Sequence, residues 1–203
     1  RLGYDVRAVD LWRFLACCPK SLNETAAAIN AEARALPGRH ILIGYSMGGR
    51  LALHALLQNN HPWQAAVIIS AHPGLSSEQE KIARRAKDTE WAVSCMEQPW
   101  QDFLASWESQ DVLLGPQPNW GDRGLLHMRR REMARSFMDW SLGVQEPLWD
   151  RLGEISIPVL WIAGENDAKF REVADRAAPK ILPVAPGERM INHGGKRPHR
   201  GAA

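Results

Sequence analysis

The decapeptide ILIGYSMGGR, residues 41–50, places one serine, Ser46, between glycines at the end of an apolar run. The residues before the serine have the length and character of a buried strand, and the residues after it have the apolar spacing of a helix. Gly44 and Gly48 complete the pattern G-x-S-x-G, which is typical of a sharp strand-to-helix turn. Small residues relieve the crowding that side chains would cause in such a turn. The stretch therefore predicts a serine hydroxyl held above a parallel sheet.

The position of this serine also predicts its chemistry. Ser46 would lie at the N-terminus of a helix, where the backbone N–H of Met47 can stabilise an oxyanion and the helix dipole favours negative charge. Tyr45, beside the serine, is expected to contact the substrate. The alternative is a glycine-rich turn with an incidental serine, and the strand before it and the helix after it favour the catalytic interpretation.

Length and composition restrict the class of protein. The chain has 203 residues, 45% of them hydrophobic and 24% charged, with a formal net charge of +2. These values fit one domain with an insertion and argue against disorder and against a nucleic-acid-binding surface. Cys17, Cys18 and Cys95 have no metal-ligand spacing. With no signal sequence and no apolar run of about 18 residues, we expect a cytoplasmic protein that does not insert into a membrane.

The rest of the chain alternates strand and helix patterns around a different middle segment. Residues 76–149 are charged, rich in tryptophan and helical in pattern, which indicates a helical cap inserted into a mostly parallel α/β sheet. We therefore expect a first core part at 1–75, the cap at 76–149 and a second core part at 150–203. Strands are expected at residues 4–9, 40–44, 65–70, 158–163 and 180–185, and helices at residues 21–36 and 47–58.

A carboxylate and a histidine are needed to activate the serine, in the chain order serine, acid, histidine. Asp167, in GENDAKF after a predicted strand, fits the acid, although it could instead cap the next helix, and Glu165 competes for the role. For the histidine the chain offers His193 and His199. His193 has a workable position in the chain order, while a disordered basic tail is the alternative.

These residues resemble those of the α/β-hydrolase superfamily and, within it, the synthases that form 2-succinyl-6-hydroxy-2,4-cyclohexadiene-1-carboxylate in menaquinone and phylloquinone biosynthesis. The resemblance covers roughly residues 4–185. It is carried by the serine turn at 44–53, AHPGL at 71–75, segments within 83–92, 103–107 and 141–152, and GENDAKF at 164–170.

The resemblance implies roles for individual residues. Ser46 would be the catalytic serine and Asp167 the acid, while Arg50, Arg84 and Trp107 match substrate-binding positions. One of Arg129, Arg130 and Arg131 matches a further substrate arginine. Guanidinium groups suit a substrate with several carboxylates, because they form bidentate, charge-assisted bonds. Arg50 and Arg84 would converge above the serine. The alternatives are solvated charges for the two arginines and a core aromatic for Trp107.

The implied reaction is a lyase reaction on a small polycarboxylate. The triad would make Ser46 basic enough to take a proton from the substrate, which then expels pyruvate, and neither metal nor organic cofactor is expected. The chain starts downstream of the loop that supplies the second oxyanion donor in this family, and Lys196 stands where one alignment places the histidine. A serine carboxylesterase and a truncated, non-catalytic homologue are the competing interpretations, and the oligomeric state stays open.

Overall fold

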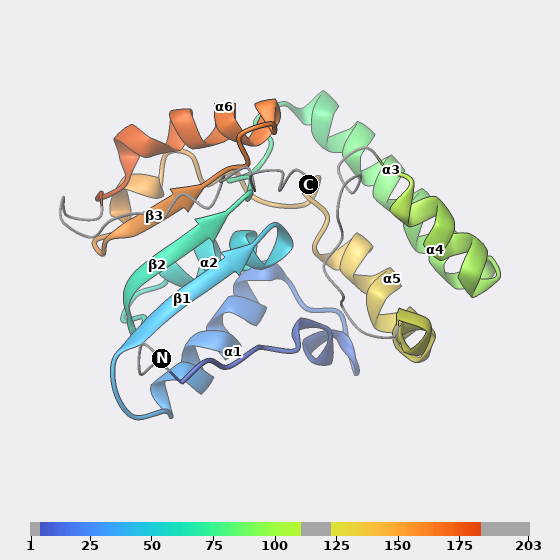
Figure 1. Cartoon of the computed structure of the whole chain (residues 1–203), viewed down its shortest axis with the longest axis horizontal. Helices are drawn as coiled ribbons and strands as arrows, with labels where there is room; N and C mark the ends of the chain where they lie inside the picture. The colour runs from blue at the N-terminus through green and yellow to red at the C-terminus, as the bar shows by residue number, and fades with distance from the viewer. Residues whose placement is uncertain (1–4, 111–122, 184–203) are drawn as a thin grey trace, which may run out of the picture. The chain divides into compact units, whose positions relative to one another are not determined.

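A computed structural model describes residues 5–110 and 123–183 (Figure 1), and these residues form two compact units. Unit 1 contains residues 5–31, 73–110 and 123–148 of the described chain, and unit 2 contains residues 32–72 and 149–183. Residues 5–31 thus group with the middle segment of the chain. The domain boundaries expected from the sequence stay a prediction.

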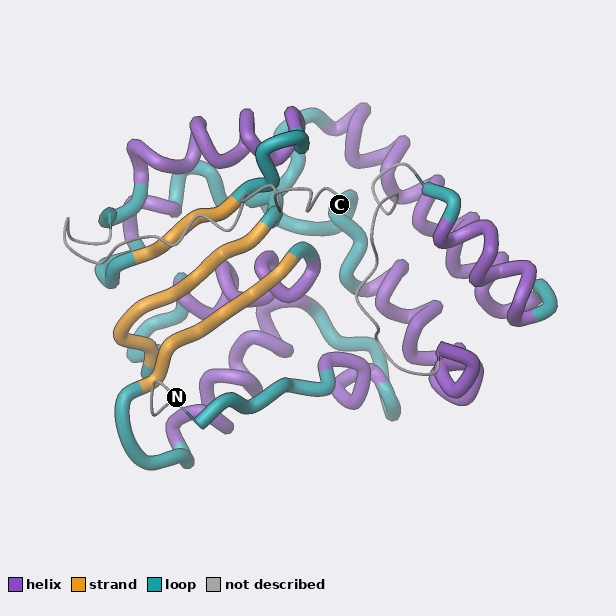
Figure 2. Tube along the Cα trace, in the orientation of Figure 1, coloured by secondary structure: helices purple, strands orange, loops and turns teal. Residues whose placement is uncertain are grey.

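Unit 2 is built on a parallel sheet with the order β1-β2-β3, whose strands lie side by side in orange in Figure 2. The strands are β1 (His40–Tyr45), β2 (Trp63–Ile69) and β3 (Val159–Ile162). The helices of this unit are α2 (Met47–Leu56) and α6 (Ala168–Ala177), with short 3-10 turns η4 (Leu152–Glu154) and η5 (Ala178–Lys180). This arrangement confirms the predicted α/β class and its parallel sheet.

The central strand explains why the sheet forms. Ala66 and Ile68 lie on one face of β2, the central strand, and are buried, and α2 packs against β1 and β2. Leu51 and Leu53 of α2 are fully buried. Burying side chains of this kind contributes about 1.5–3 kcal/mol each, so the serine turn between β1 and α2 rests on a packed layer.

Unit 1 is helical in its described part. It contains η1 (Leu11–Leu15), the larger part of α1 (Leu22–Arg34), α3 (Glu78–Glu97), α4 (Trp100–Glu108), η3 (Arg123–Arg129) and α5 (Arg130–Asp139). A fully buried residue, Trp140, donates from Nε1 to the backbone oxygen of Lys20 at 2.9 Å. The bond satisfies the one polar group of the indole, which allows the whole ring to be buried. The helices between β2 and β3 confirm the helical pattern expected for that segment.

Two strand predictions are wrong over the residues that are described. Residues 5–9 form no strand and are exposed, with Val6 at 87%. A strand needs a hydrogen-bonded neighbour, and within residues 5–110 and 123–183 no strand pairs with this segment. Lys180 ends η5 and residues 181–183 form no strand, although Leu182 accepts one backbone hydrogen bond from Val159 at 3.0 Å. Residues 184 and 185 lie outside the described chain.

Within the described residues, none of the helices has the length and apolar content needed to cross a membrane.

Candidate active site

Ser46 occupies a strained corner between β1 and α2. Its φ of 50° and ψ of −115° lie in a region that non-glycine residues rarely adopt. The backbone N–H of Ser46 donates to the oxygen of Ile69 at 2.8 Å, and its own carbonyl accepts from Arg50 N–H at 3.1 Å. These bonds hold the residue between a strand and the first turn of a helix. Ser46 is an exposed residue within the described part of the chain.

Two glycines make this corner possible. A Cβ on Gly44 would lie 2.5 Å from the backbone oxygen of Gly48, and a Cβ on Gly49 would lie 2.6 Å from the Cβ of Ala71. Sequence reasoning selected Gly44 and Gly48 and missed Gly49. The repeat GG after the serine was the available signal, because a close approach of helix to strand needs a small residue there.

Substituting Gly44 with alanine tests this packing. Because the obstructing atoms belong to the backbone of Gly48 and Gly49, they cannot rotate away. We expect Gly44→Ala to destabilise the fold by about 3 kcal/mol, measured by urea unfolding. Gly153→Ala is the matched control, since its nearest neighbour would lie at 3.7 Å, an ordinary contact. If both variants are equally stable, a Cβ at residue 44 does not collide with the backbone of Gly48 and Gly49, and the explanation is wrong.

The carboxyl ends of the three strands place Ser46 and Asp167 at the same edge of the sheet. The strands are parallel, and Ser46 directly follows β1 while Asp167 follows β3 by five residues. Backbone bonds link this edge, because Ser46 bonds to Ile69 at the end of β2 and Ser70 N–H donates to Ile162 at 2.9 Å. Ligands of open α/β sheets bind outside this edge.

Asp167 is the N-cap residue of α6. Its Oδ1 accepts from Phe170 N–H at 3.1 Å, and its backbone N–H donates to Gly164 at 3.1 Å. The capping role considered from the sequence is therefore observed. The capping bond uses Oδ1, and the second carboxylate oxygen, Oδ2, could accept from a histidine. Glu165 is exposed, and its backbone oxygen accepts from Arg171. Its carboxylate has no such bond to another residue of 5–110 or 123–183.

The two candidate histidines, His193 and His199, lie outside the described residues. Their pairing with Asp167 stays a prediction.

Arg50 is buried rather than solvated. Only 8% of it is exposed, and it lies one turn after Ser46 on α2. One turn further, His54 is 3% exposed, and burial together with the charges of Arg50 and Arg151 lowers its pKa to about 4. Sequence reasoning missed His54. Its spacing of four from Arg50 was a usable signal for a shared helix face.

The lowered pKa of His54 predicts an acid-sensitive fold. Between about pH 6.5 and pH 4 the unfolded chain binds a proton at this residue that the folded chain does not. The stability contributed by neutral His54 is thus present above pH 6.5 and is lost as the pH falls to about 4, by roughly 3 kcal/mol. His54→Leu removes the titration, so the pH dependence of unfolding should flatten in that window. An unchanged slope would contradict the assignment.

Arg84 and Trp107 belong to unit 1. Arg84 on α3 is partly exposed and pairs with the buried carboxylate of Asp88. Trp107 on α4 packs against Trp91 and Phe137, with ring centroids 5.0 Å apart in each pair. This is the core-aromatic alternative, although Trp107 keeps some exposed surface. Since Ser46 belongs to unit 2, convergence of these residues on the serine stays a prediction.

The three consecutive arginines differ in their contacts. Arg129 pairs with Asp10 at 2.9 Å, and Arg130 donates to the backbone oxygens of Met96 and Gln98. Arg131 is exposed, and within residues 5–110 and 123–183 it makes no ion pair or hydrogen bond. We therefore assign the further substrate contact expected from the sequence to Arg131 as a proposal.

Met47 and Tyr45 flank the serine as expected from their sequence positions. Met47 is the first residue of α2, and first-turn N–H groups have no partner within a helix. Tyr45 ends β1 and is 60% exposed. Contact of either residue with a substrate stays a prediction.

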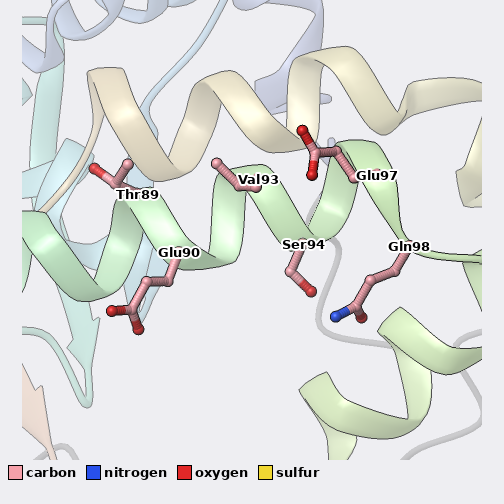
Figure 3. Close-up of a pocket in the computed structure, with 6 residues that line it drawn as sticks. All are labelled: Thr89, Glu90, Val93, Ser94, Glu97 and Gln98. Carbon is pink, nitrogen blue, oxygen red and sulfur yellow. The ribbon is translucent and has the colours of Figure 1, made fainter.

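A hollow along α3 in unit 1 is lined by none of the candidate site residues (Figure 3). It is lined by Thr89, Glu90, Val93, Ser94, Glu97 and Gln98. Two carboxylates in one hollow disfavour an anionic ligand. Among the described residues no group of His, Cys, Asp and Glu side chains is arranged to hold a metal ion.

Comparison with known proteins places the chain in a family. Residues 2–200 match the alpha/beta hydrolase family, and the chain belongs to it. The 2-succinyl-6-hydroxy-2,4-cyclohexadiene-1-carboxylate synthase of Citrobacter koseri is 32% identical over 80% of this chain and 63% of that protein. The synthase of Photorhabdus laumondii is 33% identical over 86% and 60%. The structure of MenH from S. aureus gives a TM-score of 0.70 at 26% identity, over 88% of this chain and 67% of that one.

The chain spans about three fifths of the length of these curated relatives.

Proposed function

We propose that this chain carries the catalytic residues of a lyase that forms 2-succinyl-6-hydroxy-2,4-cyclohexadiene-1-carboxylate with release of pyruvate, in menaquinone or phylloquinone biosynthesis. Relatives that are 32% and 33% identical are named as this synthase. The observation that carries the proposal is the strained, exposed Ser46 at the edge that it shares with Asp167.

The proposed mechanism begins with proton transfer. His193, oriented by Asp167, accepts the proton of Ser46 Oγ, and the resulting alkoxide removes a proton from the substrate. The electron pair released from that C–H bond forms the new double bond, and the bond to the pyruvate group breaks with its electron pair leaving on that group. The departing enolate then takes the proton held by His193 and becomes pyruvate, which restores the neutral histidine. The Met47 N–H stabilises the developing oxyanion at the helix N-terminus.

Charge provides the substrate preference in this proposal. Arg50, Arg84 and Arg131 supply guanidinium groups for the carboxylates, Trp107 and Tyr45 supply aromatic surface, and no cofactor or metal takes part. Guanidinium–carboxylate pairs are directional and charge-assisted. A neutral substrate would gain nothing from them.

The test compares two substrates on the same preparation. We expect release of pyruvate from the polycarboxylate substrate and little turnover of a neutral p-nitrophenyl ester. Rapid ester hydrolysis without pyruvate release would instead assign the chain as a serine carboxylesterase. Inactivity on both, with no labelling by a fluorophosphonate, would indicate a homologue without a working base.

A further inference from the structure

Asp88 on α3 is a buried carboxylate that needs an explanation. Its residue is 4% exposed, and its side chain 6%. Removing an ionised carboxylate from water costs several kcal/mol unless a partner compensates for it. A hydrophobic residue of similar size would often give equal or higher stability at such a site. Stability is thus a weak reason for an aspartate here.

The partner of Asp88 is Arg84, one helical turn earlier. Arg84 Nε donates to Asp88 Oδ1 at 2.9 Å and to Oδ2 at 2.8 Å, while the Arg84 side chain stays 39% exposed. Within residues 5–110 and 123–183, the hydrogen bonds of Arg84 end at Nε. Its Nη1 and Nη2 groups, which carry four N–H donors, have no acceptor there.

Neighbouring arginines of unit 1 use their Nη groups in the opposite way. Arg85 donates from Nη1 to the backbone oxygen of Gly143 at 2.9 Å, and Arg130 donates from both Nη groups to the backbone oxygens of Met96 and Gln98. These guanidinium groups tie helices and loops of unit 1 together. In Arg84, by contrast, the Nε group is bound to Asp88, and neither Nη group has an acceptor among the described residues.

We propose that Asp88 is a positioning residue that holds Arg84 through Nε, so that the Nη edge is oriented in advance for a carboxylate of the substrate. This inference rests on the proposed function, in which Arg84 binds the substrate. A free arginine side chain loses much rotamer freedom when it binds a carboxylate. Asp88 restricts the side chain before binding and thereby strengthens the complex.

The experiment measures binding of 2-succinyl-6-hydroxy-2,4-cyclohexadiene-1-carboxylate, the proposed product, by titration calorimetry on the full chain. We expect Asp88→Asn to weaken Kd about tenfold without lowering Tm, because the variant removes a buried charge. In an Arg84→Ala background, Asp88→Asn should change Kd less than about twofold, since the residue it positions is gone. Glu78→Gln is the control, because it breaks an exposed ion pair with Lys81 on the same helix and should leave Kd unchanged.

Several outcomes would overturn the inference. If Asp88→Asn lowers Tm and leaves Kd unchanged, the ion pair serves only stability. If Asp88→Asn weakens binding equally in the wild type and in Arg84→Ala, Asp88 does not act through Arg84. If the wild-type chain does not bind the product, Arg84 forms no carboxylate site and the proposal is wrong. If Asp88→Asn does not fold, Arg84→Lys is the deciding variant, because lysine keeps the positive charge but lacks the two Nη groups. An unchanged Kd in Arg84→Lys would contradict the proposal.

Pyruvate release by the wild type separates this inference from the proposed function. A chain that binds the product with the expected coupling but releases no pyruvate would contradict the function and support the positioning role. If the chain releases pyruvate but Asp88→Asn does not change Kd, the proposed function is supported and the positioning role of Asp88 is contradicted.

Discussion

Ser46→Ala is expected to lower kcat for pyruvate release by at least about 1,000-fold. In the proposed mechanism the alkoxide of Ser46 takes the substrate proton, and no neighbouring side chain replaces it. Alanine has the same difficulty as serine at a φ of 50°, so Tm should stay unchanged. The measurement is a coupled pyruvate assay beside thermal unfolding.

Ser77→Ala serves as the control for this variant. Ser77 caps α3 by accepting from Glu80 N–H at 3.4 Å, so its loss should reduce stability by about 1 kcal/mol and leave turnover intact. A fluorophosphonate should label the wild type and fail to label Ser46→Ala. Turnover by Ser46→Ala near the wild-type rate would exclude the triad mechanism.

Asp167→Asn is expected to reduce kcat about 100- to 10,000-fold, because an amide cannot orient and stabilise a charged histidine as a carboxylate does. Asparagine is as good an N-cap as aspartate, so the bond to Phe170 N–H should persist and Tm should hold. The variant thus separates the catalytic role from the cap.

Asp167→Ala completes the comparison, because it should lose activity and also about 1 kcal/mol of stability with the cap. If Asp167→Asn keeps full turnover while Glu165→Gln loses it, Glu165 is the acid.

The serine corner could be predicted from the sequence because its determinants are local. A strand pattern, the spacing G-x-S-x-G and a helix pattern lie within 20 residues of each other, and the strained φ of Ser46 agrees with that interpretation. Gly49 was missed because its reason is a contact with Ala71, far along the chain. The glycine pair after the serine was a local signal, but the segment that approaches Gly49 could not be identified from that stretch alone.

The two incorrect strand predictions also result from dependence on distant parts of the chain. Residues 4–9 and 180–185 carry strand-like residues, but strand formation depends on a partner that local preference does not supply. The helical segments were more predictable, since each helix closes its hydrogen bonds within itself.

Side-chain pairing was the least predictable feature. The spacing of Arg84 and Asp88 is that of a helical ion pair, yet such pairs are common on exposed faces and weak there. The burial of Asp88 distinguishes this pair, and burial depends on how elements pack. Here α3 packs against α5, which lies in another part of the chain. The same holds for Arg50, whose charge suggested solvent and whose residue is buried.

The central claim is that the chain converts a polycarboxylate by eliminating pyruvate. The most direct measurement follows pyruvate and 2-succinyl-6-hydroxy-2,4-cyclohexadiene-1-carboxylate together by mass spectrometry during turnover by the wild-type chain. The account predicts that both appear in equal amounts, and that neither appears with Ser46→Ala. Consumption of the substrate without pyruvate, or equal product formation by Ser46→Ala, would contradict it.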